Sequence, residues 1–197
     1  MNFSTRECWV FDMDGTLTIA VHDFAAICQE LGIPSNKNIL EGIAELPEPE
    51  AMECRQKLEA IELEIAQQSQ AQPGAIELLS QLRSQNKQIA ILTRNSKTVA
   101  TRTLAACGLD SFFNSNTILS RDCCTPKPSP EGIHHLLKTW NSKPQQAVMV
   151  GDYIFDLLTG RNAGTATVHL DVTGTFAWPE HADLCITHLD ELAQAIG

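Results

Sequence analysis

Short apolar runs of strand length recur along the chain, and helical patterns lie between them. The runs cover residues 9–11, 89–92, 147–150, 166–170 and 184–186, with a weaker one at 117–119. Helical spacing is clearest at Ile133, Leu136, Leu137 and Trp140, and at Ile76, Leu79 and Leu82 after the start signal Pro73-Gly74. This alternation predicts an α/β fold, in which helices cover both faces of a doubly wound parallel sheet.

The stretch from residue 18 to residue 71 breaks this alternation, because it holds no strand-like run. Three helical stripes follow one another there: Phe24, Ile27, Cys28 and Leu31; Ile39, Ile43 and Leu46; Leu58, Ile61 and Ile65. We therefore predict a small all-helical cap at 18–71, inserted after the first strand into a core made of 1–17 and 72–197. Such a cap would sit over the carboxyl end of that strand, where doubly wound sheets bind ligands.

Composition limits the partners and the compartment. With 197 residues, 43% of them hydrophobic, the chain can bury one core and a small insertion. A formal net charge of −10 argues against a nucleic-acid backbone or an anionic membrane as the main partner. The seven cysteines include no C-x-x-C pair, and no apolar run resembles a signal peptide or a membrane span. We expect reduced thiols and a cytoplasmic protein.

The first strand ends in two aspartates, within the stretch CWVFDMDGTLT. Alternation places Asp12 and Asp14 on the same side of an extended segment, where two like charges need a cation or a proton between them. A Ca²⁺ loop would require a third ligand at Thr16 and a glycine at Leu17, so it does not fit. A hairpin turn at Asp14-Gly15 lacks a matching second strand. From this stretch alone, a turn and a chemical role both remain open.

Three further signals follow in strand ends or loops. Thr93 ends the run IAILT, Lys127 lies in the loop TPKPSP, and Asp152 ends AVMVGD with Asp156 four residues later. Together with Asp12-x-Asp14-Gly15-Thr16, these residues resemble the four motifs of the haloacid dehalogenase-like (HAD) hydrolase superfamily, over nearly the whole chain. The pattern is most similar to the branch that includes phosphoglycolate phosphatases, whose helical cap follows the first motif.

The resemblance implies a phosphatase mechanism. Asp12 would attack phosphorus and become an aspartyl-phosphate, while Asp14 would protonate the leaving group and then deprotonate water. Mg²⁺ would be held by the side chains of Asp12 and Asp152 and by the backbone carbonyl of Asp14. Thr93 would donate its hydroxyl to a phosphoryl oxygen, and Lys127 would supply positive charge in the transition state.

Several nearby residues receive weaker assignments. Asp156 either orients Asp152 or Lys127, or is simply an acid in the first turn of a helix. Ser129 is expected to cap a helix that has Pro130 in its first position. We read Arg94 as a solvated residue and Asn95 and Ser96 as helix caps. The remaining polar or reactive residues that stand out receive no role: His134, His135, Cys123 and Cys124.

Other functions share part of the pattern. A dehalogenase of the superfamily lacks an acid at position 14, whereas a sugar phosphomutase has all four motifs. A phosphonoacetaldehyde hydrolase needs a cap lysine, and only Lys37 and Lys57 are available. Two alternatives are not enzymes. A receiver module that is phosphorylated on aspartate carries that aspartate at its third strand, whereas Asp12 follows the first strand here. An inactive scaffold would not need every motif position filled, and all four are filled in this sequence.

The substrate is expected to be a small phosphorylated metabolite. Because the cap sets the leaving group, its charge matters, and residues 18–71 contain three basic residues against ten acidic ones. We therefore expect phosphoglycolate to be a mediocre substrate, unless Arg55 or an arginine of the core turns into the site.

Overall fold

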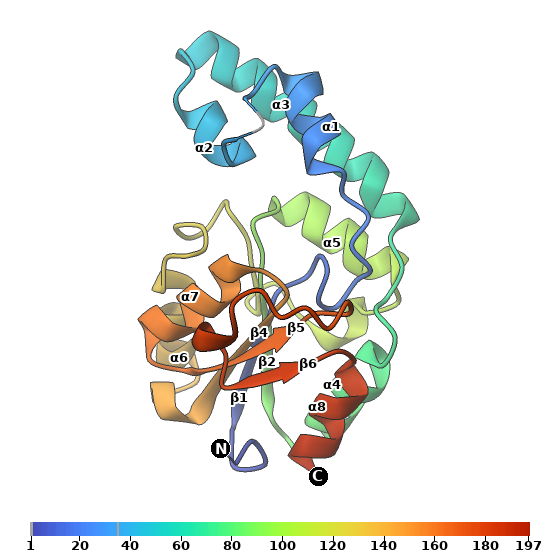
Figure 1. Ribbon diagram of the computed structural model, residues 1–197, viewed down its shortest axis with the longest axis vertical. Coiled ribbons are helices and arrows are strands. Elements are labelled where there is room, and N and C mark those ends of the chain that lie inside the picture. The colour runs from blue at the N-terminus through green and yellow to red at the C-terminus, as the bar shows by residue number, and fades with distance from the viewer. Residues whose placement is uncertain (1, 35) are drawn as a thin grey trace.

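In the computed structural model, which describes residues 2–34 and 36–197, six strands form one parallel sheet (Figure 1). Their order in the sheet is β3-β2-β1-β4-β5-β6. The strands are β1 (Cys8–Phe11), β2 (Gln88–Leu92), β3 (Ile118–Leu119), β4 (Ala147–Gly151), β5 (Ala166–Leu170) and β6 (Leu184–Ile186). The predicted doubly wound sheet is confirmed, and the weak run at 117–119 provides the edge strand β3.

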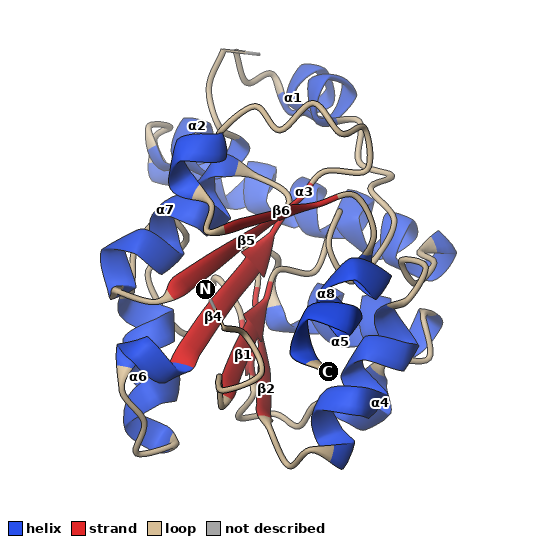
Figure 2. Cartoon of the chain, turned by 60° about the horizontal axis from the view of Figure 1, so that its bottom comes forward, coloured by secondary structure: helices blue, strands red, loops and turns tan. Residues whose placement is uncertain are grey.

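Helices cover both faces of the sheet (Figure 2). One face carries α4 (Ala75–Ser84), α5 (Lys97–Ala106) and α8 (Leu189–Ile196), and the other carries α6 (Glu131–Thr139) and α7 (Ile154–Ala163). The side chains of β1 divide between two apolar clusters, with Trp9 and Phe11 on the first face and Cys8 and Val10 on the second. Because β1 is buried on both faces, its sequence is apolar at every position.

Two local predictions were wrong. Ile76 is 44% exposed, whereas the buried stripe of α4 consists of Ala75, Leu78, Leu79 and Leu82. This stripe has i, i+3, i+4, i+7 spacing and begins on the small residue Ala75, whose contribution to the pattern is easily overlooked. In α6 the N-cap is Pro130 and the helix begins at Glu131, one residue later than expected. Ser129 still contributes, since its Oγ accepts a hydrogen bond of 3.3 Å from the Glu131 N–H.

Three helices stand above the core in Figure 1: α1 (Phe24–Leu31), α2 (Ile39–Ala44) and α3 (Glu48–Gln68). They share an apolar cluster of their own, built around Ile27, Ile43 and Leu58. Phe24 was expected in this packing stripe, but it is 63% exposed. We call residues 18–71 the cap. As limits of a separate domain, these bounds stay a prediction, and residue 35 of the cap and residue 1 of the core lie outside the described residues.

The two linkers that join the cap to the core are paired. The Ile19 N–H donates to the Gln70 carbonyl at 3.0 Å, and the Gln72 N–H donates to the Leu17 carbonyl at 2.9 Å. Backbone pairing of this kind satisfies polar groups that would otherwise be free and holds the two linkers side by side.

A buried ion pair fastens the long helix α3 to the core. Both carboxylate oxygens of Glu62 accept hydrogen bonds from the Arg121 guanidinium, each at 2.9 Å. The side chains are only 9% and 14% exposed, respectively. Burial raises the pKa of Glu62, and the Arg121 guanidinium opposes that shift. A second contact joins α3 to the core. The hydroxyl of Ser96, the N-cap of α5, donates a hydrogen bond of 3.1 Å to Glu59 of α3.

Breaking this ion pair should destabilise the protein more than breaking an exposed one. Arg121→Gln leaves the Glu62 carboxylate buried without a cation, which we expect to lower the free energy of unfolding by about 3–5 kcal/mol. The double variant Glu62→Gln/Arg121→Gln should recover most of this loss. Urea unfolding of the four proteins of the double-mutant cycle measures both effects.

The matched control is Lys57→Gln, which removes the partner of Glu53 on the exposed face of the same helix α3. This variant should unfold at the same urea concentration as the wild type. Equal losses in Arg121→Gln and Lys57→Gln would contradict the assignment of Glu62 and Arg121 as the fastening contact.

Candidate active site

The site lies at the carboxyl ends of β1, β2 and β4. The sheet register pairs Phe11 with Ile91 on one side and with Val150 on the other. Because the three strands run parallel, the segments that follow them start at the same edge. The Asp12 N–H continues the ladder by donating to the Val150 carbonyl at 2.9 Å. Parallel register therefore brings Asp12, Thr93 and Asp152 together, although they are far apart in sequence.

Lys127 lies between two of the aspartates. Its Nζ is 2.6 Å from Asp12 Oδ1 and 2.6 Å from Asp156 Oδ1, and its side chain is 3% exposed. Burial alone would lower the pKa of Lys127, but the carboxylates of Asp12 and Asp156 raise it above its usual value. The lysine thus remains a cation in the buried site, where it neutralises part of the negative charge.

Asp156 combines the two interpretations left open by its sequence position. Its Oδ1 contacts Lys127, and its Oδ2 accepts a hydrogen bond of 3.0 Å from the Tyr153 N–H at the start of α7. It therefore both caps a helix and positions the lysine. Gly151 makes room for it, because a Cβ at that position would lie 2.2 Å from Asp156 Cβ.

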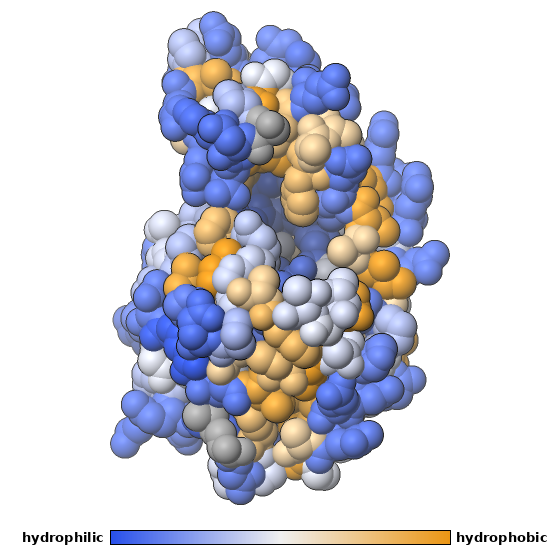
Figure 3. Space-filling model, in the orientation of Figure 1, coloured by the Kyte–Doolittle hydropathy of each residue, from blue (hydrophilic) through white to orange (hydrophobic). Residues whose placement is uncertain are grey.

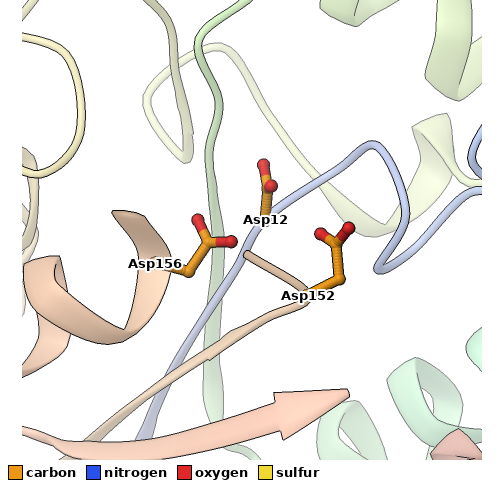
Figure 4. Close-up of side chains that lie close together, drawn as sticks. All are labelled: Asp12, Asp152 and Asp156. Carbon is orange, nitrogen blue, oxygen red and sulfur yellow. The ribbon is translucent and has the colours of Figure 1, made fainter. Parts of the chain in front are cut away.

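The carboxylates of Asp12, Asp152 and Asp156 converge (Figure 4), and an oxygen of each lies within 4.8 Å of the others. Thr16 donates its hydroxyl to Asp152 Oδ1 at 3.2 Å. The turn before Thr16 requires glycine, because Gly15 has φ +81° and a Cβ there would lie 2.2 Å from Asp152 Oδ2. Burial and the negative charges of Asp12 and Asp156 raise the pKa of Asp152 to about 8.

Asp14 occupies a different part of the same site. Its Oδ2 accepts a hydrogen bond of 2.6 Å from the Asn95 side-chain amide, while His22 Nδ1 lies 3.9 Å from its Oδ1. Burial and the nearby Asp12 raise the pKa of Asp14 to about 7. Thr93 Oγ1 accepts the Asn95 backbone N–H at 3.1 Å, which leaves the hydroxyl proton of Thr93 free to be donated.

These residues line one cavity of about 510 Å³ between the core and the cap, at the hollow visible in Figure 3. All six residues singled out in the sequence lie in its wall: Asp12, Asp14, Thr93, Lys127, Asp152 and Asp156. The cap contributes mostly apolar side chains, including Phe24, Ile39 and Leu58. The exposed position of Phe24 is thus explained, because it faces the cavity.

Sequence reasoning missed several residues of the cavity wall. Arg94 is half-buried and not a solvated surface residue, Asn95 holds Asp14, and Arg121 enters from the loop after β3. Only Ser96 behaves as the expected cap, since its Oγ accepts the Val99 N–H at 3.2 Å. Arg94 and Arg121 both follow a strand closely, so the rule that ligands bind at carboxyl ends would have found them.

The residues without an assigned role stay outside this cavity. His134 and His135 are exposed on α6. Cys123 is exposed, and burial raises the pKa of the Cys124 thiol to about 12, so the latter is no thiolate at neutral pH.

The donor set fits a hard divalent cation. Three carboxylates, of which Asp156 is buried and the other two are partly buried, crowd around one point, and the single ammonium of Lys127 does not balance their charge. Oxygen ligands of this kind suit Mg²⁺ or Ca²⁺ better than soft transition metals. Asp156 is the least available of the three, because both of its oxygens already have partners.

Comparison with known proteins agrees with this arrangement. The model of the family described as haloacid dehalogenase-like hydrolase matches residues 9–170, from β1 to the end of β5. The chain belongs to this family. The hydrolase is 30% identical over 192 residues to the uncharacterized hydrolase YOR131C of Saccharomyces cerevisiae, covering 95% of this chain and 88% of that protein.

Two further relatives span the whole fold. The N-acetylmuramic acid 6-phosphate phosphatase of Pseudomonas putida is 30% identical over 213 residues, which cover 95% of this hydrolase and 94% of that protein. The crystal structure of a hydrolase from Pseudomonas syringae superimposes with a TM-score of 0.79 at 25% identity, covering 98% of this chain and 100% of the other. Within the described residues of this hydrolase, no helix combines the length and the apolar character needed to cross a membrane.

The raised carboxyl pKa values predict how the stability of metal-free protein depends on pH. A carboxyl whose pKa is higher in the folded than in the unfolded state stabilises the fold fully below about pH 4, and this stabilisation is lost as pH rises through the folded pKa. For Asp14, Asp152 and Asp156 that loss runs from about pH 4 and is complete near their folded pKa values of about 7 to about 8. After treatment with a chelator, the melting temperature should therefore fall between about pH 5.5 and about pH 8.5.

Asp152→Asn should flatten this dependence, because an amide has no proton to lose over that range. Asp110→Asn, at an exposed position away from the cavity, should leave the dependence as in the wild type. Thermal unfolding followed by circular dichroism measures the three profiles. A wild-type profile that Asp152→Asn does not alter would show that the buried carboxylates are not its cause.

Proposed function

We propose that this hydrolase is a Mg²⁺-dependent phosphatase that cleaves a small phosphomonoester through an aspartyl-phosphate intermediate. The observation that carries the proposal is the way Asp12 is held. Its Oδ1 contacts the Lys127 ammonium and the Met13 N–H, each at 2.6 Å. Within the described residues its Oδ2 accepts no hydrogen bond, so this oxygen is available to attack a phosphorus atom in the cavity.

In the first step, a carboxylate oxygen of Asp12 forms a bond to phosphorus while the bond to the leaving oxygen breaks. Lys127 and the hydroxyl of Thr93 stabilise the negative charge on the phosphoryl oxygens. Asp14 donates its proton to the departing alkoxide. A pKa of about 7 suits this role, because a proportion of the carboxyl is protonated at neutral pH.

In the second step, water replaces the leaving group. The Asp14 carboxylate, held by Asn95, accepts a proton from that water as its oxygen attacks phosphorus. The bond between phosphorus and Asp12 breaks, and inorganic phosphate leaves. The same aspartate thus acts first as an acid and then as a base.

The proposed Mg²⁺ ligands are the side chains of Asp12 and Asp152 and the backbone carbonyl of Asp14, with Asp156 positioning Lys127. When bound, the ion supplies positive charge that neutralises these carboxylates and the substrate phosphate. The converging carboxylates support this assignment. The similarity to the N-acetylmuramic acid 6-phosphate phosphatase of Pseudomonas putida supports phosphatase chemistry.

The alternatives differ in their support. A Schiff-base mechanism would need a free cap lysine, but Lys37 pairs with Glu45 and Lys57 pairs with Glu53. A sugar phosphomutase keeps the same catalytic residues, so it remains the second candidate. It would return the phosphoryl group to a sugar phosphate, whereas a phosphatase releases it to water. Measurement of inorganic phosphate during turnover separates the two.

Separate substitution of the two aspartates tests the proposed roles with p-nitrophenyl phosphate and Mg²⁺. Asp12→Asn should abolish activity, because no covalent intermediate can form. Asp14→Asn should release about one equivalent of nitrophenol in a burst, because this leaving group departs without a proton, and then turn over about 10²- to 10⁴-fold more slowly than the wild type. Rapid-quench kinetics and intact-protein mass measure the burst and the phosphate held on Asp12.

Asp110→Asn serves as the control and should turn over like the wild type. Excess chelator should stop the wild-type reaction. An Asp12→Asn enzyme that still turns over, or an Asp14→Asn enzyme without a burst, would show that the roles are assigned wrongly.

A further inference from the structure

Arg94 differs from the other cations of the cavity. Within residues 2–34 and 36–197, four lysines or arginines line the cavity wall, and three of them contact carboxylates: Lys127 with Asp12 and Asp156, Arg121 with Glu62, and Lys37 with Glu45. In the same described residues, Arg94 makes no salt bridge, and its guanidinium donates no hydrogen bond to another residue. Its Cζ instead lies 4.9 Å from the centre of the Phe155 ring.

A half-buried guanidinium without an anionic partner is energetically unfavourable. Burial lowers the pKa of Arg94, yet an arginine side chain remains charged at neutral pH. Contact with the Phe155 ring offsets only a small part of the free energy lost when the guanidinium is partly removed from water. The five N–H donors of the guanidinium form a planar fork that matches a carboxylate. A ligand that brings a carboxylate to this place would therefore satisfy both the charge and the donors.

The main chain holds Arg94 in place. It follows Thr93 at the end of β2, and its carbonyl accepts a hydrogen bond of 3.3 Å from Arg121 Nη1. Arg121 is in turn fixed by Glu62 of the cap helix α3. The backbone that carries Arg94 is thus fastened to the cap and to the sheet, and the Phe155 ring is the contact that positions the guanidinium itself.

Arg94 lies toward the leaving-group side of the cavity. Carboxylates on two sides act on its guanidinium: Glu41 of the cap helix α2 most strongly, and then Asp12 and Asp156 of the core, so Arg94 lies between the cap and the nucleophile. The proposed place of the transferring phosphoryl group is surrounded by Asp12, Lys127 and Thr93 in the core. A leaving group that extends from phosphorus toward the cap would pass Arg94 and the rings of Phe155 and Tyr153.

We propose that Arg94 binds a carboxylate on the leaving group, so that this hydrolase selects phosphomonoesters of carboxylate-bearing alcohols or phenols. This inference rests on the proposed phosphatase function. It also revises the expectation that phosphoglycolate is a mediocre substrate. That expectation rested on the charges of the cap and made an exception for Arg55 or a core arginine that turns into the site. Arg94 is such a core arginine, whereas Arg55 pairs with Glu48 on the exposed surface.

Binding of two matched phosphonates tests the role of Arg94 without requiring turnover. The ligands are (4-carboxybenzyl)phosphonate and its methyl ester at the carboxyl group, measured by titration calorimetry with Mg²⁺ present. The wild type should bind the free carboxylate about 10- to 100-fold more tightly, as expected for a charge-assisted hydrogen bond. Arg94→Gln should lose this preference while it still binds the methyl ester like the wild type.

Two further variants act as controls. Lys37→Gln removes another cation of the same cavity, one already paired with Glu45, and should keep the preference. Arg94→Lys should retain part of it, because an ammonium keeps the charge but lacks the planar fork. Melting temperatures of all variants should match that of the wild type, since Arg94 makes no ion pair with the described residues whose loss would destabilise the fold.

The outcomes that overturn the proposal are distinct. Equal weakening of both ligands in Arg94→Gln would place the arginine on the transferring phosphoryl group. An equal loss of preference in Lys37→Gln would indicate a general charge effect, and a wild type without preference would exclude the carboxylate subsite. Turnover of 4-carboxyphenyl phosphate and of its methyl ester is measured alongside. If neither is hydrolysed while the binding preference holds, the phosphatase proposal fails and the carboxylate subsite stands.

Discussion

The site depends on the electrostatic cost of holding three carboxylates close together away from water. Asp12, Asp152 and Asp156 meet at the carboxyl ends of β1 and β4, and Lys127 supplies one buried positive charge between them. One ammonium does not neutralise three carboxylates, so protons remain on some of them unless a cation is bound. Burial, together with this imbalance, raises the pKa values of Asp152 and Asp156. The imbalance also makes the site fit a divalent ion, and a site that holds such an ion would attract a phosphoryl group.

The parallel sheet makes this crowding possible. Its register brings the ends of β1, β2 and β4 to one edge, and glycines at 15 and 151 let backbone and carboxylates approach closely. The cap then closes the edge from above and is fastened by the buried pair of Glu62 and Arg121. Arg121 also donates a hydrogen bond to the backbone carbonyl of Arg94. The Arg121 side chain therefore links the cap helix α3 to the part of the cavity where the leaving group is proposed to bind.

Sequence reasoning predicted the sheet, because strand-length apolar runs are local signals, and it singled out the six polar residues because together they resemble the motifs of one family. It missed what depends on distant partners. Arg121 is positioned by its ion pair with Glu62, which lies 59 residues away in the sequence, and Asn95 is positioned by its hydrogen bond to Asp14. Phe24 was misjudged for a related reason, since a residue that lines a cavity and one that packs in a core follow the same helical spacing.

The central claim is that Asp12 is the group that becomes phosphorylated, between Lys127 and a divalent ion. A crystal structure of the protein with Mg²⁺ and beryllofluoride, which mimics a phosphoryl group on a carboxylate, tests it most directly. The account predicts beryllium bonded to an Asp12 oxygen, fluorine atoms in contact with Lys127 and Thr93, and Mg²⁺ against Asp12 and Asp152. Beryllofluoride bonded to Asp14, or Mg²⁺ bound away from Asp152, would contradict the account.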